Sequence, residues 1–224
     1  MNLVSTRGWS PGSSANISVR VPKTNHVCIK STGTSMTFGA VDPESSVVVL
    51  DLGGNQVDGI RKPSVEFRFH LGIYRVRPDV GAVLHAHPPH ATAYAVANQV
   101  LPLVSGPGRL VLRKVPLLAF AEPGSQELAS IVTRAFSDRA ILSALLSGHG
   151  VVAVGADMYE AFKYLDWTED AAQIAFLSGL LKPRDSGDRG FVRCGYRSTS
   201  SMMTPSKGSL KTAILQGFFP GFLA

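Results

Sequence analysis

Short hydrophobic runs rich in valine and isoleucine alternate along the chain with longer segments in which hydrophobic residues recur every three or four positions. The short runs predict strands, because β-branched side chains suit a pleated, half-buried surface. Glycine and proline separate them, as at Gly53-Gly54 and Pro123-Gly124, and predict turns. The alternation predicts an α/β fold, with strands at residues 27–31, 46–50, 80–85, 110–115, 140–145 and 151–154.

Three of the longer segments predict helices. The first opens at Pro63, which suits a first helical turn, and ends before Pro78. Within it, Val65, Phe69 and Ile73 recur at helical spacing and predict one buried face. The other two helices are predicted at residues 125–136 and 157–181, the last with a hydrophobic stripe that would pack on the core.

The composition changes once, near Pro183. Residues 1–181 predict one α/β domain, whereas residues 182–224 form a basic extension rich in Ser and Gly, with no sustained period. Of the net charge of +6, this extension carries +5, from seven Lys or Arg and two Asp. Because the basic residues gather in a polar segment, we expect a solvated tail and no nucleic-acid partner.

Length and composition narrow the class of protein further. A chain of 224 residues with 45% hydrophobic and 17% charged residues is globular rather than disordered. No apolar run reaches the roughly 18 residues of a membrane span, and no basic-then-apolar leader opens the chain, so we expect a cytoplasmic protein without a membrane partner. Two cysteines, Cys28 and Cys194, are too few for a disulfide framework or a four-thiolate zinc site.

Three histidines carry the sharpest chemical signal. His85 and His87 stand at positions i and i+2 at the end of a predicted strand, so their side chains point to the same face. His149 lies between Gly148 and Gly150, which allow a tight turn and a close approach. Three imidazoles with an open fourth position are typical of catalytic zinc, although imidazole also suits other divalent metals. The alternative is that they are ordinary core histidines.

Glu66 and several polar loops are further candidates. Glu66 lies in the first turn of the helix that opens at Pro63, where the helix dipole alone would stabilise a carboxylate. Beside a metal, the same carboxylate can act as a general base. Small polar loops at residues 10–16 and 31–35, together with Ser64 at the helix start, offer hydroxyls and free amides to an anion. Each loop taken alone is more typical of a simple turn.

Taken in chain order, these segments resemble the class II aldolase and adducin family. The resemblance spans about residues 8–181 and rests on five ordered segments. They are the loop at residues 12–20, Thr32-Gly33, the helix start at residues 63–70, the His85-Ala86-His87-Pro88-Pro89 segment, and residues 149–155.

The resemblance implies a fold, a reaction and a set of roles. The family fold is a three-layer α/β/α domain around a mostly antiparallel sheet, and its enzymes are usually homotetramers. The implied reaction is zinc-dependent cleavage of a phosphorylated ketose, such as L-fuculose 1-phosphate, to dihydroxyacetone phosphate and an aldehyde through an enediolate. The implied metal ligands are His85, His87 and His149, the acid/base is Glu66, and the phosphate contacts are Asn16, Thr32, Gly33 and Ser64.

Other interpretations of the same site stay open. Family relatives dehydrate methylthioribulose 1-phosphate, epimerise ribulose 5-phosphate at C4 or decarboxylate a sugar-acid phosphate, and adducin heads are non-catalytic oligomerisation modules. This chain also differs from the family pattern. Ala15 replaces a glycine, Val65 replaces a second serine, no tyrosine lies between residues 98 and 123, and the segment before Arg7 is shorter than the usual N-terminal helix.

Overall fold

The centre of the molecule is an eight-stranded sheet with the order β4-β3-β2-β1-β5-β8-β7-β6. The computed structural model describes residues 2–34 and 43–181, within a compact unit that spans Met1–Pro183. Every neighbouring pair is antiparallel except β6 with β7, which confirms the predicted α/β class and mostly antiparallel sheet. The strands are β1 (Asn16–Arg20), β2 (His26–Lys30), β3 (Val47–Asp51), β4 (Gln56–Asp58), β5 (Ala82–Ala86), β6 (Leu117–Leu118), β7 (Ser143–Leu146) and β8 (Gly150–Gly155).

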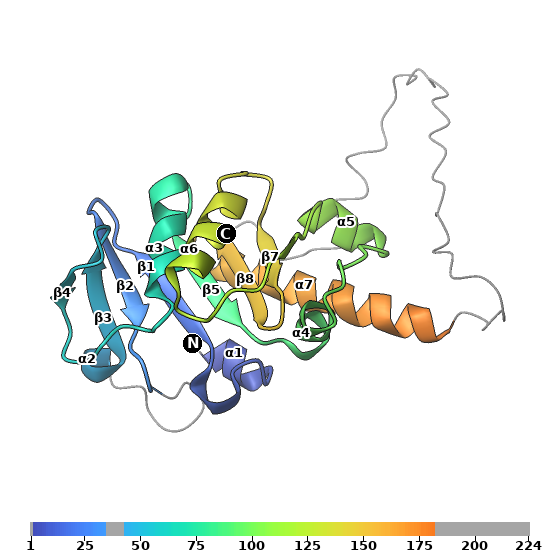
Figure 1. Cartoon of the computed structure of the whole chain (residues 1–224), viewed down its shortest axis with the longest axis horizontal. Helices are drawn as coiled ribbons and strands as arrows, with labels where there is room; N and C mark the ends of the chain where they lie inside the picture. The colour runs from blue at the N-terminus through green and yellow to red at the C-terminus, as the bar shows by residue number, and fades with distance from the viewer. Residues whose placement is uncertain (1, 35–42, 182–224) are drawn as a thin grey trace, which may run out of the picture. The chain divides into compact units, whose positions relative to one another are not determined.

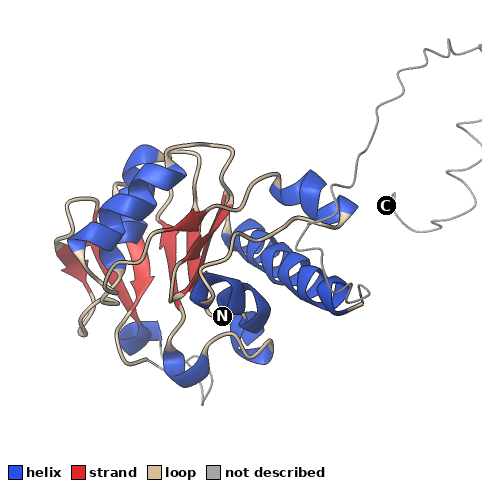
Figure 2. Cartoon of the chain, turned by 45° about the vertical axis from the view of Figure 1, so that its right-hand side comes forward, coloured by secondary structure: helices blue, strands red, loops and turns tan. Residues whose placement is uncertain are grey.

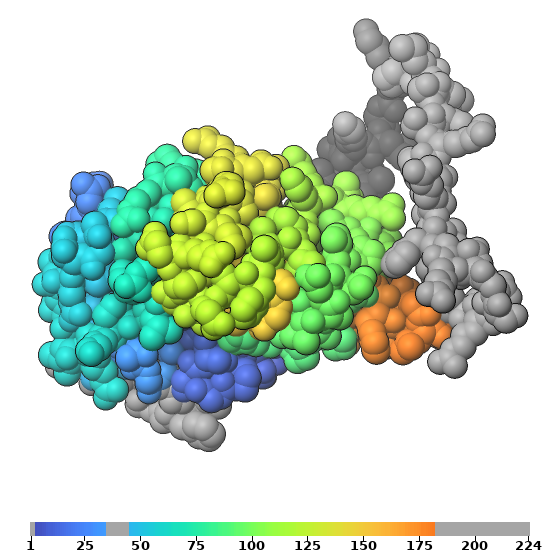
Figure 3. Space-filling view, viewed as in Figure 1, coloured from blue at the N-terminus to red at the C-terminus, as the bar shows by residue number. Residues whose placement is uncertain are grey.

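Helices cover both faces of this sheet and make three layers (Figures 1 and 2). On one face, α3 (Phe67–Val76) packs beside α6 (Gln126–Phe136) over a core cluster that includes Phe69 and Val132. On the other, the long helix α7 (Met158–Leu180) lies across β5 and β8, with α1 (Asn2–Thr6), α4 (Pro89–Val96) and α5 (Gly106–Leu112) around it. The orange end of α7 extends past the green segments that cover the rest of the helix (Figure 3). Two short turns, the 3-10 helix η1 (Pro11–Ser13) and α2 (Pro43–Ser46), complete the elements.

The two central strands divide their side chains between the two cores. Ala82 and Leu84 of β5 belong to the core under α7, whereas Val83 belongs to the core under α3 and α6. Because successive residues of a strand face opposite ways, His85 must share the face of Val83. Its ring lies edge-on to Phe69 of α3, with 5.9 Å between ring centroids. The imidazole of His85 therefore lies on the face of the sheet that α3 covers.

Five of the six predicted strands overlap observed ones, but the strand predicted at residues 110–115 is wrong. Residues Gly106–Leu112 form helix α5 instead. Ser105 caps this helix, because its Oγ accepts a hydrogen bond from the Gly108 N–H, and Pro107 occupies the first turn. Leu112 then buries its side chain in the core under α7, so capping and packing outweigh a weak strand pattern.

Several boundaries also differ from expectation. The first predicted helix begins at Phe67 rather than Pro63, and residues 16–20, expected within a loop, form β1. The N-terminal helix α1 is five residues long and packs Val4 into the core, which agrees with the short segment expected there. The extension predicted at residues 182–224 lies outside the described residues. Within the described ranges, no helix is both long and apolar enough to cross a membrane.

The contact between α3 and α6 predicts opposite outcomes for one substitution at two helical glycines. A Cβ at Gly72 would lie 1.9 Å from Thr133 Oγ1, whereas a Cβ at Gly179 in α7 would meet no atom of the described residues within 4 Å. We expect Gly72→Ala to lower the free energy of unfolding by about 1–3 kcal/mol through overpacking. Gly179→Ala should change it by at most about 1 kcal/mol, in the stabilising direction.

Denaturant unfolding of both variants measures the difference. Thr133→Ala removes the colliding side chain, so Gly72→Ala should cost much less in that background. If Gly72→Ala lowered the free energy of unfolding equally with Thr133 and with Ala at position 133, the contact between Gly72 and Thr133 would not be the cause of the loss.

Candidate active site

The structure brings the three predicted histidines together at one end of β5 and β8. His85 lies near the end of β5, His87 follows it by two residues, and His149 immediately precedes β8. One nitrogen from each ring lies within 4.8 Å of the others. Gly150 permits this approach, because a Cβ there would lie 2.7 Å from His87 Cδ2 and 2.8 Å from the Ala86 carbonyl oxygen. Any larger residue at position 150 would therefore collide with the segment that carries His85 and His87.

Backbone and loop contacts orient two of the rings. His85 Nδ1–H donates to the Val151 carbonyl at 2.9 Å, which leaves the lone pair of Nε2 aimed at the cluster. His87 Nδ1 hydrogen-bonds with Ser14 Oγ at 3.0 Å. Burial, followed by the neighbouring His87 and His149, holds the pKa of His85 well below its ordinary value, and burial also lowers the pKa of His87. Both rings are therefore neutral near pH 7, the form that coordinates metals.

Glu66 faces the histidines rather than capping its helix. It occupies the N-cap position of α3, but its side chain makes no capping hydrogen bond. Its Oε2 lies 3.4 Å from His85 Nε2, and its Oε1 lies 3.7 Å from His149 Nε2. The residue is only 4% exposed. A dipole-stabilised cap, the simpler explanation offered by the sequence, does not describe this carboxylate.

The centre holds buried polar atoms without partners, and this fits a divalent metal. In the described part of the chain, four buried side-chain N or O atoms lack a hydrogen bond, and three of them are Glu66 Oε1, His85 Nε2 and His149 Nδ1. A buried polar atom without a partner costs about 1–3 kcal/mol. A cation held by the three rings would engage the lone pair of His85 Nε2, and the nearby Glu66 carboxylate would offset its charge. Imidazole nitrogens favour divalent transition metals over magnesium or calcium.

The predicted phosphate loops also converge, beside this centre. Ser31 forms a β-bridge with Pro63, which joins the Thr32-Gly33 turn to the segment before α3. The Ser64 N–H donates to the Lys30 carbonyl at 3.0 Å, and the Thr32 N–H donates to the Lys62 carbonyl at 2.9 Å. The buried Ser64 and the exposed Thr32 and Gly33 therefore border one another.

Lys30 is a candidate that sequence reasoning missed. Its side chain is almost wholly buried, and Nζ donates to the Ser13 carbonyl at 2.9 Å, which ties the first polar loop to the second. Burial lowers the pKa of this ammonium. The available signal was a charged residue inside the hydrophobic run at residues 27–31, where a cation needs a partner.

The side chain of Asn16 makes hydrogen bonds at both ends with other buried side chains. Its Nδ2 donates to Glu66 Oε2 at 2.7 Å, and its Oδ1 accepts from His70 Nε2 at 2.5 Å. The neighbouring Ala15 has an ordinary negative φ, and its methyl group packs in the core under α7. The alanine that replaces the family glycine therefore points away from the site.

His90 lies outside the metal centre, beyond the turn at Pro88-Pro89. Its Nδ1 and its backbone N–H both contact Glu169 Oε1 of α7, at 2.8 and 3.1 Å. The other oxygen of this carboxylate, Glu169 Oε2, accepts from the Ala91 N–H at 2.9 Å. Glu169 therefore caps the start of α4 and holds the His90 ring away from the three clustered histidines.

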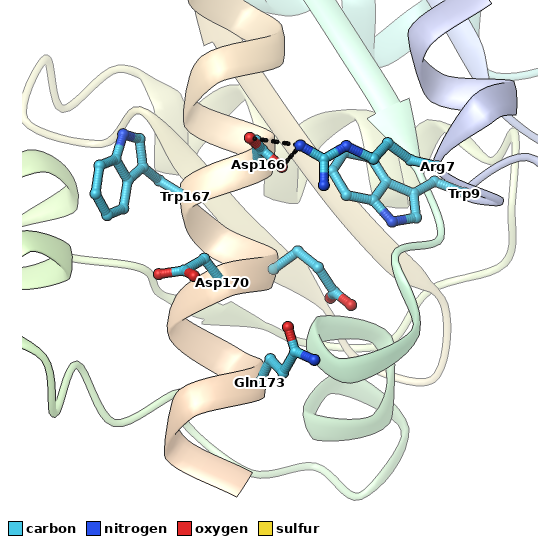
Figure 4. Close-up of a pocket in the computed structure, with 7 residues that line it drawn as sticks. Arg7, Trp9, Asp166, Trp167, Asp170 and Gln173 are labelled. Atoms are coloured by element: carbon cyan, nitrogen blue, oxygen red, sulfur yellow. Dashed lines mark hydrogen bonds and ion pairs between the residues drawn. The ribbon is translucent and has the colours of Figure 1, made fainter. Parts of the chain in front are cut away.

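A separate hollow lies beside α7, where Arg7 and Trp9 face Asp166, Asp170 and Gln173 (Figure 4). It has a volume of about 290 Å³. Arg7 pairs with Asp166 at 3.2 Å, and the buried Trp9 ring stacks on Phe162 with 5.7 Å between centroids. Three carboxylates, including Glu169, against one guanidinium disfavour an anionic ligand in this hollow.

Comparison with known proteins identifies the family of this chain. Residues 1–176 match the family model described as Class II Aldolase and Adducin N-terminal domain. An L-fuculose phosphate aldolase of Methanococcus maripaludis is 33% identical over 181 residues, covering 81% of this chain and 94% of that protein. A 3-oxo-tetronate 4-phosphate decarboxylase of Haemophilus influenzae is 32% identical over 176 residues, covering 76% of this chain and 80% of that protein.

Solved structures agree with the sequence relatives. The L-fuculose-1-phosphate aldolase from Thermus thermophilus superposes with a TM-score of 0.69 at 28% identity, covering 80% of this chain and 90% of that one. Fold, site geometry and sequence thus lead to one conclusion: this chain belongs to the class II aldolase and adducin family.

Proposed function

We propose that this protein is a metal-dependent lyase that cleaves a phosphorylated ketose, such as L-fuculose 1-phosphate, to dihydroxyacetone phosphate and an aldehyde. The observation that carries the proposal is the convergence of three imidazoles within 4.8 Å, with a buried carboxylate 3.4 and 3.7 Å from two of them. An adducin-like scaffold without chemistry has no need of such a cluster.

His85, His87 and His149 would hold the metal, and zinc is the ion we propose because three histidines with an open position suit it. When bound, the ion supplies Lewis acidity to the carbonyl and hydroxyl oxygens of the ketose. The protein fixes the rings through the Val151 carbonyl and Ser14 Oγ, so the site is organised before substrate arrives.

Glu66 would handle the proton at C3. Cleavage of the C3–C4 bond turns the C4 hydroxyl into the aldehyde carbonyl, with loss of the hydroxyl proton, and leaves an electron pair at C3 of the three-carbon product. C3 must then gain a proton, which the reverse reaction removes. Oε2 is held by the Asn16 amide, whereas Oε1 has no hydrogen-bond partner among the described residues. We therefore assign the proton to Oε1.

The phosphate would bind where the loops meet. Thr32 and Gly33 form an exposed turn, Ser64 lies at the approach to α3, and Lys30 supplies a nearby positive charge. Asn16, which the family resemblance places among the phosphate contacts, has its side chain engaged by Glu66 and His70. We assign the phosphate to the other three residues and Lys30. A homotetramer, which the family resemblance implies, and a cytoplasmic location, which the sequence leads us to expect, complete the proposal.

The reaction itself is tested first by release of dihydroxyacetone phosphate from L-fuculose 1-phosphate, with zinc-loaded and chelator-stripped protein compared side by side. We expect release from the loaded protein and its loss after stripping. Protein that retains zinc but releases no product would overturn the aldolase assignment. Dehydratase, epimerase and decarboxylase substrates would then be assayed, since a decarboxylase shares 32% identity with this chain.

Two substitutions separate metal binding from proton transfer. His87→Ala removes one imidazole, so we expect the purified protein to lose both its metal and its turnover. Glu66→Gln keeps the shape of the side chain but removes the base, and should retain metal while turnover falls by about 10²–10⁴-fold. Metal analysis beside steady-state rates measures both. Full activity of Glu66→Gln would show that another group moves the proton.

The phosphate assignment predicts a selective effect on substrate binding. Lys30→Met and Ser64→Ala should raise KM for the phosphorylated ketose by about tenfold or more, the loss of one charge-assisted contact, with metal content unchanged. Lys114→Met, at an exposed lysine paired with Asp138 at 3.8 Å, is the matched control. The same substitutions should leave turnover of the unphosphorylated ketose unaltered, and an equal loss with that substrate would contradict the assignment.

A further inference from the structure

A continuous chain of buried hydrogen bonds leads away from Glu66 between α3 and β1. Beyond the Asn16 amide, His70 Nδ1 lies 2.7 Å from Ser18 Oγ, and Ser18 Oγ lies 2.9 Å from the Tyr74 hydroxyl. All five residues are buried, and His70 is 0% exposed. The aldol reaction as described above uses Glu66 and its contact with Asn16, and gives no role to His70, Ser18 and Tyr74 behind them.

The chemistry of the donors and acceptors fixes one direction along this chain. An ionised Glu66 carboxylate can only accept, so the Asn16 Nδ2 must donate and its Oδ1 must accept. His70 therefore donates from Nε2–H, which leaves Nδ1 to accept from the Ser18 hydroxyl. The Ser18 oxygen in turn accepts from the Tyr74 hydroxyl. Every proton points toward the carboxylate.

The backbone spacing makes this alignment a property of the two elements. Glu66, His70 and Tyr74 stand four residues apart, which is a rise of about 6 Å per step along a helix. Asn16 and Ser18 stand two apart on β1, which is about 6.6–6.8 Å along a strand. The two polar rows therefore stay in register, on the face of β1 opposite to the buried Ile17.

Burial keeps the chain in its neutral state. It lowers the pKa of His70 to about 3, against a smaller opposing effect of Glu66, and it raises the pKa of Tyr74. An imidazole that stays neutral cannot simply be a counter-ion for the carboxylate. Its contribution is a fixed donor at Nε2 and a fixed acceptor at Nδ1.

We propose that His70 is a positioning residue for Glu66, acting through Asn16, with Ser18 and Tyr74 holding its ring in the Nε2–H tautomer. The chain fixes Oε2 and leaves Oε1 as the oxygen that meets the substrate proton. Asn16 then serves the carboxylate rather than the phosphate. The inference rests on the proposed role of Glu66 as the group that handles the proton at C3.

The kinetic test compares His70→Gln with His70→Asn in the metal-loaded enzyme. Both are neutral amides, but a glutamine nitrogen can take the place of Nε2 and reach Asn16, whereas the shorter asparagine cannot. We expect His70→Asn to lower kcat by about 10²-fold, because a displaced catalytic group loses its alignment. KM should stay within about twofold, and His70→Gln should recover most of kcat.

Three outcomes would overturn the proposal. They are an unchanged kcat in His70→Asn, equal losses in both variants, and a rise in KM at constant kcat, which would indicate a phosphate role. Melting temperature and metal content of each variant show whether the fold and the metal survive.

A matched serine pair tests the outer part of the chain. Ser18 on β1 and Ser143 on β7 are both fully buried, and each hydroxyl contacts one other side-chain hydroxyl, Tyr74 for Ser18 and Thr168 for Ser143. Ser18→Ala should lower kcat, whereas Ser143→Ala should leave kcat unchanged. Equal effects of the two substitutions on kcat would reduce the chain to ordinary core packing and overturn the proposal.

An NMR measurement tests the chain without any turnover. With ¹⁵N-labelled histidine in the metal-loaded full-length protein, we expect the His70 signal, assigned by its loss in His70→Gln, to show a neutral ring protonated at Nε2. A ring protonated at Nδ1, or a charged ring near pH 7, would overturn the proposed direction. If no ketose phosphate is cleaved, the proposed function fails, and this spectrum still decides whether the chain is ordered as described.

Discussion

The antiparallel pairing of β5 with β8 is the constraint on which the site depends. Its register places His85 opposite Val152 and Ala86 opposite Val151, so the end of one strand meets the beginning of the other. His87 and His149 lie just beyond this pair, on the two segments that the register brings together. A shift of one residue would turn His85 to the opposite face of the sheet. The metal centre is thus a consequence of strand register, and Gly150 supplies the space that it requires.

The same centre is a cost to the apo fold. Buried imidazoles and a buried carboxylate lose hydration, and three of their polar atoms have no hydrogen-bond partner among the residues that the structure describes. A cation that binds only the folded state would stabilise that state and offset the cost of burying these groups. The core around the site is correspondingly dense, since Val83, Val152 and Phe69 are at most 1% exposed. Packing against these buried side chains holds the polar groups in an arrangement that they would not adopt alone.

Much of this arrangement could be predicted from the sequence, because strong local signals produce it. The His85/His87 spacing, the glycines around His149 and the β-branched runs each indicate the correct element. The helix α5 was missed because its cap and Pro107 were outweighed by a short apolar run. Lys30 had a signal in its own segment, a charged residue inside an apolar run, and that signal was overlooked. The chain behind Glu66 was missed for a different reason: it depends on which strand lies under which helix, and no pattern within one segment contains that information.

The family scaffold supports more than one named reaction. Relatives at 33% and 32% identity carry the names of an aldolase and a decarboxylase, so the family fold does not fix the bond that breaks. A metal centre that stabilises negative charge next to a carbonyl serves either reaction. We infer that groups which place protons contribute to this choice, and the two oxygens of Glu66 are unequal here because Asn16 holds only one of them. In this chain the sheet builds the centre, and the buried row of α3 determines which carboxylate oxygen is available to the substrate.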